Sequence, residues 1–473
     1  MTARPDPLRP LPSIEPVTPS PNEEASMNRP SKPSSFRRPI AAAAMLLAAG
    51  LCGTASAQSF KEVVEAARAY DAAYLAARAA ADASRHKAAQ ADALERPTVG
   101  LQAGLTRSGN DTPLYNSRSN TAGTLGVVAS QPLFNRQNAL TIDKARKAQD
   151  VAQADLLGAE QDLIVRVAQA YFDVLAAQDT LATARASRTA ISEQLASAKR
   201  NFEVGTATIT DTREAQARFD LATAQELAAD NDLRTKRLAL DQIVGRSGLQ
   251  PHGLALPVAL PVPAETVEAW VEKTEESPSV RKARMAYEIA KLETRRTDAG
   301  HMPTVDLQGQ IGAANNRGSG VVSAGGAGTS TNHSIGVTLK LPLYTGQAID
   351  NQVREAVSLE EKSRNELDAA RRAVAQATRQ VYFGVQSGAA QVRALEAAEA
   401  SSKLALDATK LGYKVGVRVN LDVLNAQTQL YSTQRDLAKA RYDVLVNGLK
   451  LRQAAGALTP TDVEAVSSLL TAK

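Results

Sequence analysis

The chain is poor in the residues on which metal sites and disulfide-stabilised folds depend. Its 473 residues include one cysteine and four histidines, and aromatic side chains make up 4%. A single cysteine excludes a disulfide within the chain. His86, His252, His301 and His333 are scattered without metal-ligand spacing, and no nucleophile elbow is present. We therefore predict neither an enzyme nor a metal or cofactor site.

Concentrated charge and long apolar runs are also missing. The 55 basic residues are dispersed among 50 acidic ones, so we predict no nucleic-acid binding. No stretch approaches the ~20 uninterrupted apolar residues of a transmembrane helix. If the chain is exported, it is therefore periplasmic, secreted, or inserted in an outer membrane as β-strands.

Residues 1–57 are predicted to be an N-terminal extension followed by a cleaved signal peptide. A basic Arg37-Arg38 pair precedes a short apolar stretch at 40–51, and residues 55–57 form a small-residue cleavage site. The mature chain then begins near Gln58.

Two features of this leader have alternative interpretations. Translation from Met27 instead of Met1 would give a leader of ordinary length. Lipidation of Cys52 competes with cleavage near 57, although Leu51 is a poor fit for the residue before a lipidated cysteine. Without lipidation, the mature chain contains no cysteine.

The rest of the chain is an internal duplication. A series of matching positions recurs in one register, which chance does not supply. The matches are Tyr171-Phe172 with Tyr382-Phe383, Val204-Gly205 with Val415-Gly416, Asp211 with Asp422, and Gly245 with Gly456.

Both repeats follow the same predicted order of helix, two strands, very long helix, Val-Gly turn and return helix. The first repeat is 58–245, with strands at about 98–107 and 122–133; the second is 278–456, with strands at about 304–314 and 333–343. The Gly-, Ser- and Asn-rich stretches 107–123 and 314–333 are predicted to be hairpin loops. The long helices are expected at about 136–200 and 346–411, and the return helices at about 211–245 and 422–456.

The predicted strands alternate between apolar and polar residues. Val99, Leu101 and Leu105 share one face, opposite Thr98 and Gln102. Period two fits a membrane strand and a half-buried strand of a soluble sheet equally well. In a membrane, four strands cannot close a barrel, so other copies must complete it. Three copies give twelve strands, and two copies give eight.

The helices are predicted to pack side by side along their length. About 65 helical residues at ~1.5 Å each extend roughly 100 Å, so two shorter helices stacked end to end can line one long helix. A seven-residue spacing on the second return helix indicates a coiled-coil-like seam. Its row is Val423, Leu430, Leu437, Val444 and Leu451.

These features closely resemble the TolC family of outer-membrane efflux proteins. The resemblance covers about 60–456 and is carried by the Val-Gly turns, by QPLF at 131–134 and LPLY at 341–344, and by residues 411–456. It implies a mixed α/β membrane protein, built mostly of long helices in an α-barrel. Four transmembrane strands per chain would complete a trimeric twelve-stranded β-barrel.

The resemblance also implies a place and a function. The protein would lie in the outer membrane with a large periplasmic extension, and 246–277 and 457–473 would form equatorial segments. It would conduct substrates from an inner-membrane ABC or RND transporter and a periplasmic adaptor (membrane fusion protein) to the exterior, in type I secretion, multidrug efflux or both. The implied partners include outer-membrane lipid and two further copies. A periplasmic coiled-coil adaptor or structural protein is the alternative, which the second hairpin disfavours.

The resemblance finally assigns roles at the hairpin tips. The turns would lie where the tunnel narrows, and Asp422 would form a ring at the constriction. Asn425 stands where the best-known member of the family has a second aspartate, so the ring should carry less negative charge. Such a ring favours cations and can bind multivalent cations that block it. The tip turns are Val204, Gly205, Val415 and Gly416, and the implied latch is Asp211 facing Tyr413 and Thr210 facing Arg418.

Helix capping is the other interpretation of the two aspartates. Asp211 and Asp422 each stand where a return helix starts, and a short acidic side chain there satisfies free N–H groups. Capping and a role in the pore are compatible.

Overall fold

The computed structural model describes residues 59–471, apart from 113–114, 256–262 and 319–327. The predicted signal peptide, Cys52 and the alternative start at Met27 lie outside the described residues. The chain divides into two units after Ala55, and all of the described residues belong to the second, Ser56–Lys473.

The first repeat contains four helices of four or more residues and two strands. They are α2 (Phe60–Tyr70), α3 (Ala72–Asp92), β1 (Thr98–Thr112), β2 (Tyr115–Phe134), α4 (Arg136–Glu203) and α5 (Ile209–Val244), with a short 3-10 turn at Ala93–Glu95. The second repeat contains α7 (Pro278–Asp298), β4 (Thr304–Gly318), β5 (Gly328–Lys340), α8 (Ala348–Lys414) and α9 (Asn420–Ala454). Short 3-10 turns precede and follow α7 at Thr274–Glu276 and Ala299–His301.

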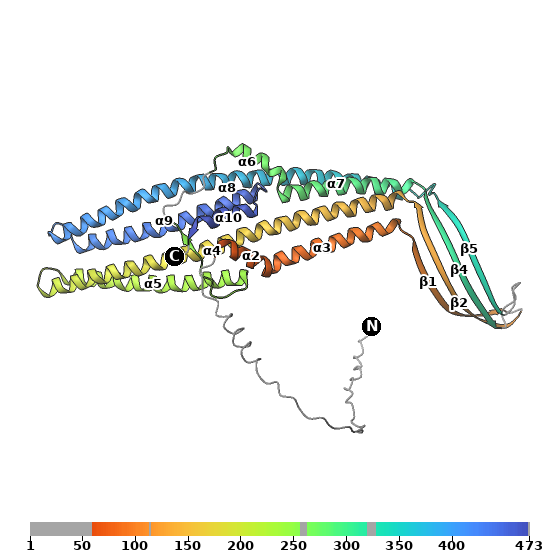
Figure 1. The fold of residues 1–473 in the computed structure, drawn as a ribbon, viewed down its shortest axis with the longest axis horizontal. Coiled ribbons are helices and arrows are strands. Elements are labelled where there is room, and N and C mark those ends of the chain that lie inside the picture. The colour runs from red at the N-terminus through yellow and green to blue at the C-terminus, as the bar shows by residue number, and fades with distance from the viewer. Residues whose placement is uncertain (1–58, 113–114, 256–262, 319–327, 472–473) are drawn as a thin grey trace, which may run out of the picture. The chain divides into compact units, whose positions relative to one another are not determined.

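Two long helices organise the helical part. Helices α3 and α5 both pack along α4, and α7 and α9 both pack along α8, so each long helix is lined by two shorter ones end to end (Figure 1). The expected stacking is therefore confirmed. The two halves join because α4 also packs on α7 and α9. None of the described helices has a segment apolar enough, over sufficient length, to cross a membrane.

The seam on α9 is buried as its seven-residue spacing predicts. Val423, Leu437 and Val444 are each at most 2% exposed, and Leu430 and Leu451 at most 7%. Burying a side chain of this size contributes about 1.5–3 kcal/mol. The row therefore holds the second hairpin together and fixes its rotation about the long axis.

An aromatic cluster lies half-way along the helices. Phe60, Tyr171, Phe172 and Tyr442 are almost fully buried, with ring centroids 5.4–6.1 Å apart. The matching Phe383 of the second repeat is 55% exposed. The repeated pair thus serves as core in only one of the two halves.

The segments outside the repeats lie near this core. Within 246–277 the structure has strand β3 (Gly253–Leu254) and helix α6 (Val267–Lys273), and within 457–473 it has α10 (Pro460–Ser468) and β6 (Leu470–Thr471). Strands β3 and β6 pair with each other. The irregular pattern of these stretches therefore corresponds to short elements that join across the two repeats.

The four long strands form one antiparallel sheet in the order β1-β2-β4-β5. Its register places Leu101 opposite Val127 and Val127 opposite Ile311. Residues directly opposite each other share a face, so the apolar sets of neighbouring strands fall on the same side. Leu101, Leu105, Ile311 and Ile335 are 63–82% exposed, and the apolar face is therefore uncovered in the single chain.

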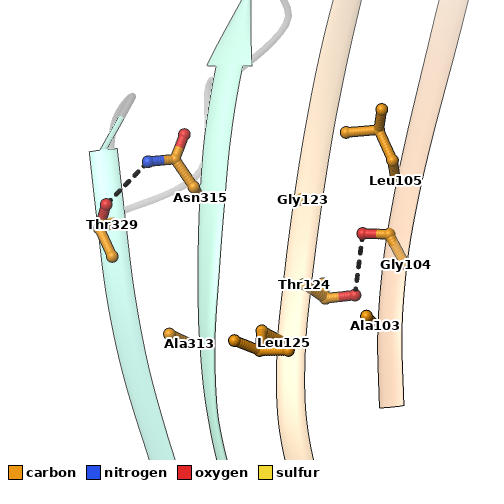
Figure 2. Close-up of a pocket in the computed structure, with 9 residues that line it drawn as sticks. All are labelled: Ala103, Gly104, Leu105, Gly123, Thr124, Leu125, Ala313, Asn315 and Thr329. Carbon is orange, nitrogen blue, oxygen red and sulfur yellow. Dashed lines mark hydrogen bonds between the residues drawn. The ribbon is translucent and has the colours of Figure 1, made fainter. Parts of the chain in front are cut away.

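The prediction that 107–123 and 314–333 are loops was wrong for most of both stretches. The strands β1, β2, β4 and β5 continue through them, because the main-chain hydrogen bonds of a ladder do not require apolar side chains. Figure 2 shows Asn315 Nδ2 donating to Thr329 Oγ1 at 2.8 Å across this polar region. Small residues such as Ala103 and Gly123 leave a hollow on the sheet face there.

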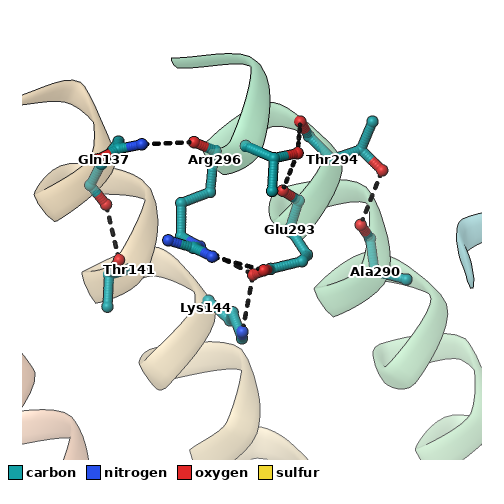
Figure 3. A network of polar contacts seen from close by, with 8 residues as sticks. Gln137, Thr141, Lys144, Ala290, Glu293, Thr294 and Arg296 are labelled. Atoms are coloured by element: carbon teal, nitrogen blue, oxygen red, sulfur yellow. Dashed lines mark hydrogen bonds and ion pairs between the residues drawn. The ribbon is translucent and has the colours of Figure 1, made fainter. Parts of the chain in front are cut away.

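A polar network ties α7 to α4 close to the sheet. Glu293 accepts hydrogen bonds from Arg296 at 2.7 Å and from Lys144 at 2.8 Å (Figure 3). These two cations, Arg296 first, lower the pKa of the Glu293 carboxyl to about 2. Gln137 Nε2 donates to the Arg296 carbonyl at 3.4 Å. The network joins the two repeats where α4 begins after β2 and where α7 ends before β4.

Candidate functional site

Both Val-Gly turns close in the same way at the end of a long helix. Gly205 has φ +78° and Gly416 has φ +82°, values that favour glycine. In the first turn, the Thr206 amide donates to the Asn201 carbonyl at 2.8 Å and the Gly205 amide to the Phe202 carbonyl at 3.0 Å. This is the Schellman pattern of helix termination.

The second turn repeats these bonds. The Val417 amide donates to the Gly412 carbonyl at 2.9 Å, and the Gly416 amide donates to the Tyr413 carbonyl at 3.1 Å. The side chains of Val204 and Val415 are 73% and 66% exposed. Each of the two hairpins therefore ends in an exposed valine side chain.

Both predicted aspartates cap the return helices. Asp211 Oδ2 accepts from the Thr208 amide at 3.0 Å, and Thr208 Oγ1 accepts from the Asp211 amide at 3.2 Å, which completes a capping box. Asp422 Oδ2 accepts from the Val419 amide at 3.4 Å. Val419 has no side-chain oxygen to reciprocate, so Asp422 is held more loosely than Asp211.

Three side-chain hydrogen bonds join the two hairpins near the tip. Asn201 Nδ2 donates to the Tyr413 hydroxyl at 3.1 Å, linking α4 with α8. Arg218 donates to Asn425 Oδ1 at 3.1 Å, linking α5 with α9. The third runs from Gln194 Nε2 on α4 to Asn420 Oδ1 on α9.

The predicted latch residues thus lie at the tip, and Asp211, Tyr413 and Arg418 have partners of their own in the single chain. Arg418 lies 3.7 Å from Asp422, and Thr210 is exposed in the first turn of α5. Among the hydrogen bonds and ion pairs of the described residues, none joins Asp211 to Tyr413 or Thr210 to Arg418. Those two pairings stay predictions about the assembled protein.

Sequence reasoning missed the residues that bridge the hairpins. Gln194, Asn201, Arg218 and Asn420 stand in helical stretches where a polar residue usually faces water, and no local pattern distinguishes them. Asn420 is only 3% exposed, and its Nδ2 has no partner in the described part of the chain. Only the packing of one hairpin on the other identifies these residues.

Comparison with known proteins decides the family. The profile of the family described as "Outer membrane efflux protein" matches residues 63–246 and 271–457. The chain belongs to this family. The two matched segments correspond closely to the two repeats.

Relatives and solved structures agree with this membership. The outer membrane protein TolC of Vibrio cholerae is 33% identical over 414 residues, covering 87% of this chain and 94% of the relative. The alkaline protease secretion protein AprF of Pseudomonas aeruginosa is 35% identical over 349 residues, covering 72% and 70%. The crystal structure of the outer membrane protein VceC from Vibrio cholerae superposes with a TM-score of 0.72 at 20% identity, covering 84% of this chain and 96% of that one. At this identity the superposition concerns the fold.

Proposed function

We propose that this protein is one subunit of a trimeric outer-membrane channel that carries substrates from an inner-membrane pump to the exterior. The observation that carries the proposal is the sheet. It has four strands, an uncovered apolar face and two outer strands, β1 and β5, each paired on one side only. Open strand edges are not tolerated in lipid, so other copies must complete the sheet.

The helical part supports the same assembly. Helices α5 and α8 lie at opposite sides of the chain (Figure 1) and expose large apolar residues. Leu227 and Leu238 on α5 are each 69% exposed, and Leu404 and Leu411 on α8 are 73% and 62% exposed. Contact between α5 of one copy and α8 of the next would bury these side chains and close the helices into a tunnel. Three copies supply twelve strands.

The names of the relatives suggest which kinds of substrate the channel carries. Relatives named for protease secretion and for efflux are both similar to this chain. We propose a conduit that works with an inner-membrane ABC or RND transporter through a periplasmic adaptor. A periplasmic coiled-coil adaptor is the second candidate. It leaves the four long strands without a role.

The tips would form the gate. Asp422 and Asn425 would line the constriction, and the turns Val204-Gly205 and Val415-Gly416 would form the periplasmic end. Polar hydrogen bonds join the hairpins there, and water can replace them at modest net cost, about 0.5–1.5 kcal/mol each. The tip can therefore open without unfolding the apolar seam.

A matched pair of strand variants tests membrane insertion. Ile335→Arg places a cation on the apolar face of β5, which costs about 2–4 kcal/mol per chain at the middle of a membrane. Ser334→Arg places the same cation on the opposite face. We expect Ile335→Arg to reduce the heat-sensitive trimer in outer-membrane fractions and Ser334→Arg to leave it. Recovery of the unaltered protein as a soluble periplasmic monomer would contradict the proposal.

A further inference from the structure

Two guanidinium groups stand beside the residues predicted to line the constriction. Arg418 Nη1 lies 3.7 Å from Asp422 Oδ2, and Arg218 Nη2 lies 3.1 Å from Asn425 Oδ1. Asp422 and Asn425 are one turn apart on α9, so the four side chains form one group. We name Arg218, Arg418, Asp422 and Asn425 the tip cluster.

The charges of the tip cluster do not cancel. Asp422 contributes one negative charge, and Arg418 beside it offsets that charge. Arg218 donates to a neutral amide, and no carboxylate pairs with it in the part of the chain that the structure describes. Arginine keeps its proton at any physiological pH. Each chain therefore brings one uncompensated positive charge to this group.

We propose that Arg218 and Arg418 make the constriction select anions, and that multivalent cations do not block it. The inference rests on the proposed function, in which three tip clusters meet at the narrowest point. A ring of charged side chains sets the ion preference of a pore, and these groups act within the ~8 Å screening length of physiological salt. The proposed anion preference is the opposite of what Asp422 alone predicts, because a ring of aspartates prefers cations.

The same charge would act on larger cargo. Anionic small molecules and acidic segments of an unfolded polypeptide gain from a positive ring, whereas dicationic or tricationic compounds are repelled by it. Arg218 is the decisive residue because its charge has no acidic partner among the described residues. Arg418 acts differently, because it offsets the negative charge of Asp422. Removing Arg418 would leave that charge uncompensated.

Reversal potentials of single channels test the proposal. The purified full-length protein is placed in planar bilayers under a tenfold KCl gradient. We expect chloride to be more permeant than potassium in the unaltered protein, Arg218→Gln to lower the chloride-to-potassium ratio several-fold, and Arg218→Gln with Arg418→Gln to reverse the sign. Arg218→Lys should keep the anion preference, because it keeps the charge.

Arg213→Gln is the matched control. Arg213 is an exposed cation on the same helix, and among the described contacts it touches neither Asp422 nor Asn425.

Block by hexamminecobalt(III) is a second readout. The unaltered channel should stay open at concentrations that block the Arg218→Gln, Asn425→Asp double variant, which carries two acidic residues per chain and one fewer cation. A wider gate would change conductance, but it would not reverse the sign of the potential.

Three outcomes would overturn the inference. Potassium preference in the unaltered protein would refute it directly, as would its block at the same hexamminecobalt concentration as the double variant. Equal effects of Arg213→Gln and Arg218→Gln would show that general surface charge, not the tip cluster, sets the preference. If the unaltered protein forms no channels, the proposed function itself fails. That result is distinct from a channel with the wrong selectivity.

Discussion

Replacing Gly456 with alanine should destabilise the protein far more than the same change at Gly416. Both glycines end helices at positive φ, +71° and +82° respectively. An alanine in this region costs about 1–2 kcal/mol. Their surroundings differ, because an added Cβ at Gly416 meets nothing within 4 Å. At Gly456 it would lie 2.5 Å from Ser277 Cα and 2.8 Å from Ser277 N.

The contact at Gly456 cannot be relieved by rotating a side chain. Both atoms belong to the backbone, so α9 and the start of α7 must move apart, and overpacking of this kind costs about 1–3 kcal/mol. Ser277 is also the N-cap of α7, with Oγ accepting from the Val280 amide at 3.3 Å. Loss of a cap costs about 0.5–2 kcal/mol. We expect a loss of about 2.5–7 kcal/mol for Gly456→Ala, the upper end applying if the cap is lost, and about 1–2 kcal/mol for Gly416→Ala.

The assay is thermal unfolding of the purified protein in detergent, followed by circular dichroism at 222 nm. Gly456→Ala should lower the melting temperature clearly more than Gly416→Ala, and protease should then cut near the junction of α9 and α7 first. Equal melting temperatures for the two variants would refute the argument that a rigid backbone contact adds to the strain of positive φ.

Two further predictions concern polar contacts, one buried and one partly exposed. Tyr442 is 6% exposed and donates to Asp179 Oδ2 at 2.7 Å, so Tyr442→Phe should cost about 1.5–3 kcal/mol. Tyr431→Phe is its control, since that hydroxyl makes no hydrogen bond among the described residues; an equal loss of melting temperature in both variants would contradict the prediction. The pKa of Glu293 lies at about 2, below its ordinary 4.5, chiefly because of Arg296, so its stabilising effect is present above pH 4.5 and lost as the pH falls toward 2. Melting curves of Glu293→Gln should therefore differ from those of the unaltered protein at pH 7 and converge near pH 2, and a constant difference would argue against it.

Much of the helical part could be predicted from local patterns. The row from Val423 to Leu451 follows a seven-residue spacing and is buried throughout. The Val-Gly pairs predicted the turns, because only glycine adopts positive φ readily. Long helices and their turns depend on neighbouring residues, which the sequence displays directly.

The ends of the strands could not be predicted from local sequence patterns. Alternation at Val99 and Leu101 predicted the first part of β1, about 98–107, but the strand continues to Thr112. The ends are decided by pairing with another strand, which leaves no mark on side-chain polarity. Sequence reasoning therefore found the apolar band of the sheet and missed its polar extension.

By itself, the sequence determined the duplication, the lengths of the helices, the positions of the turns and the apolar band of the strands. Only the tertiary structure decided which residues meet between the two hairpins. Tyr413 contacts Asn201, and Asn425 contacts Arg218, although about two hundred residues separate each pair in sequence. Such contacts depend on the rotation and stagger of whole helices against each other. The charge at the tip is therefore a property of the packed hairpins, and Asp422 alone does not reveal it.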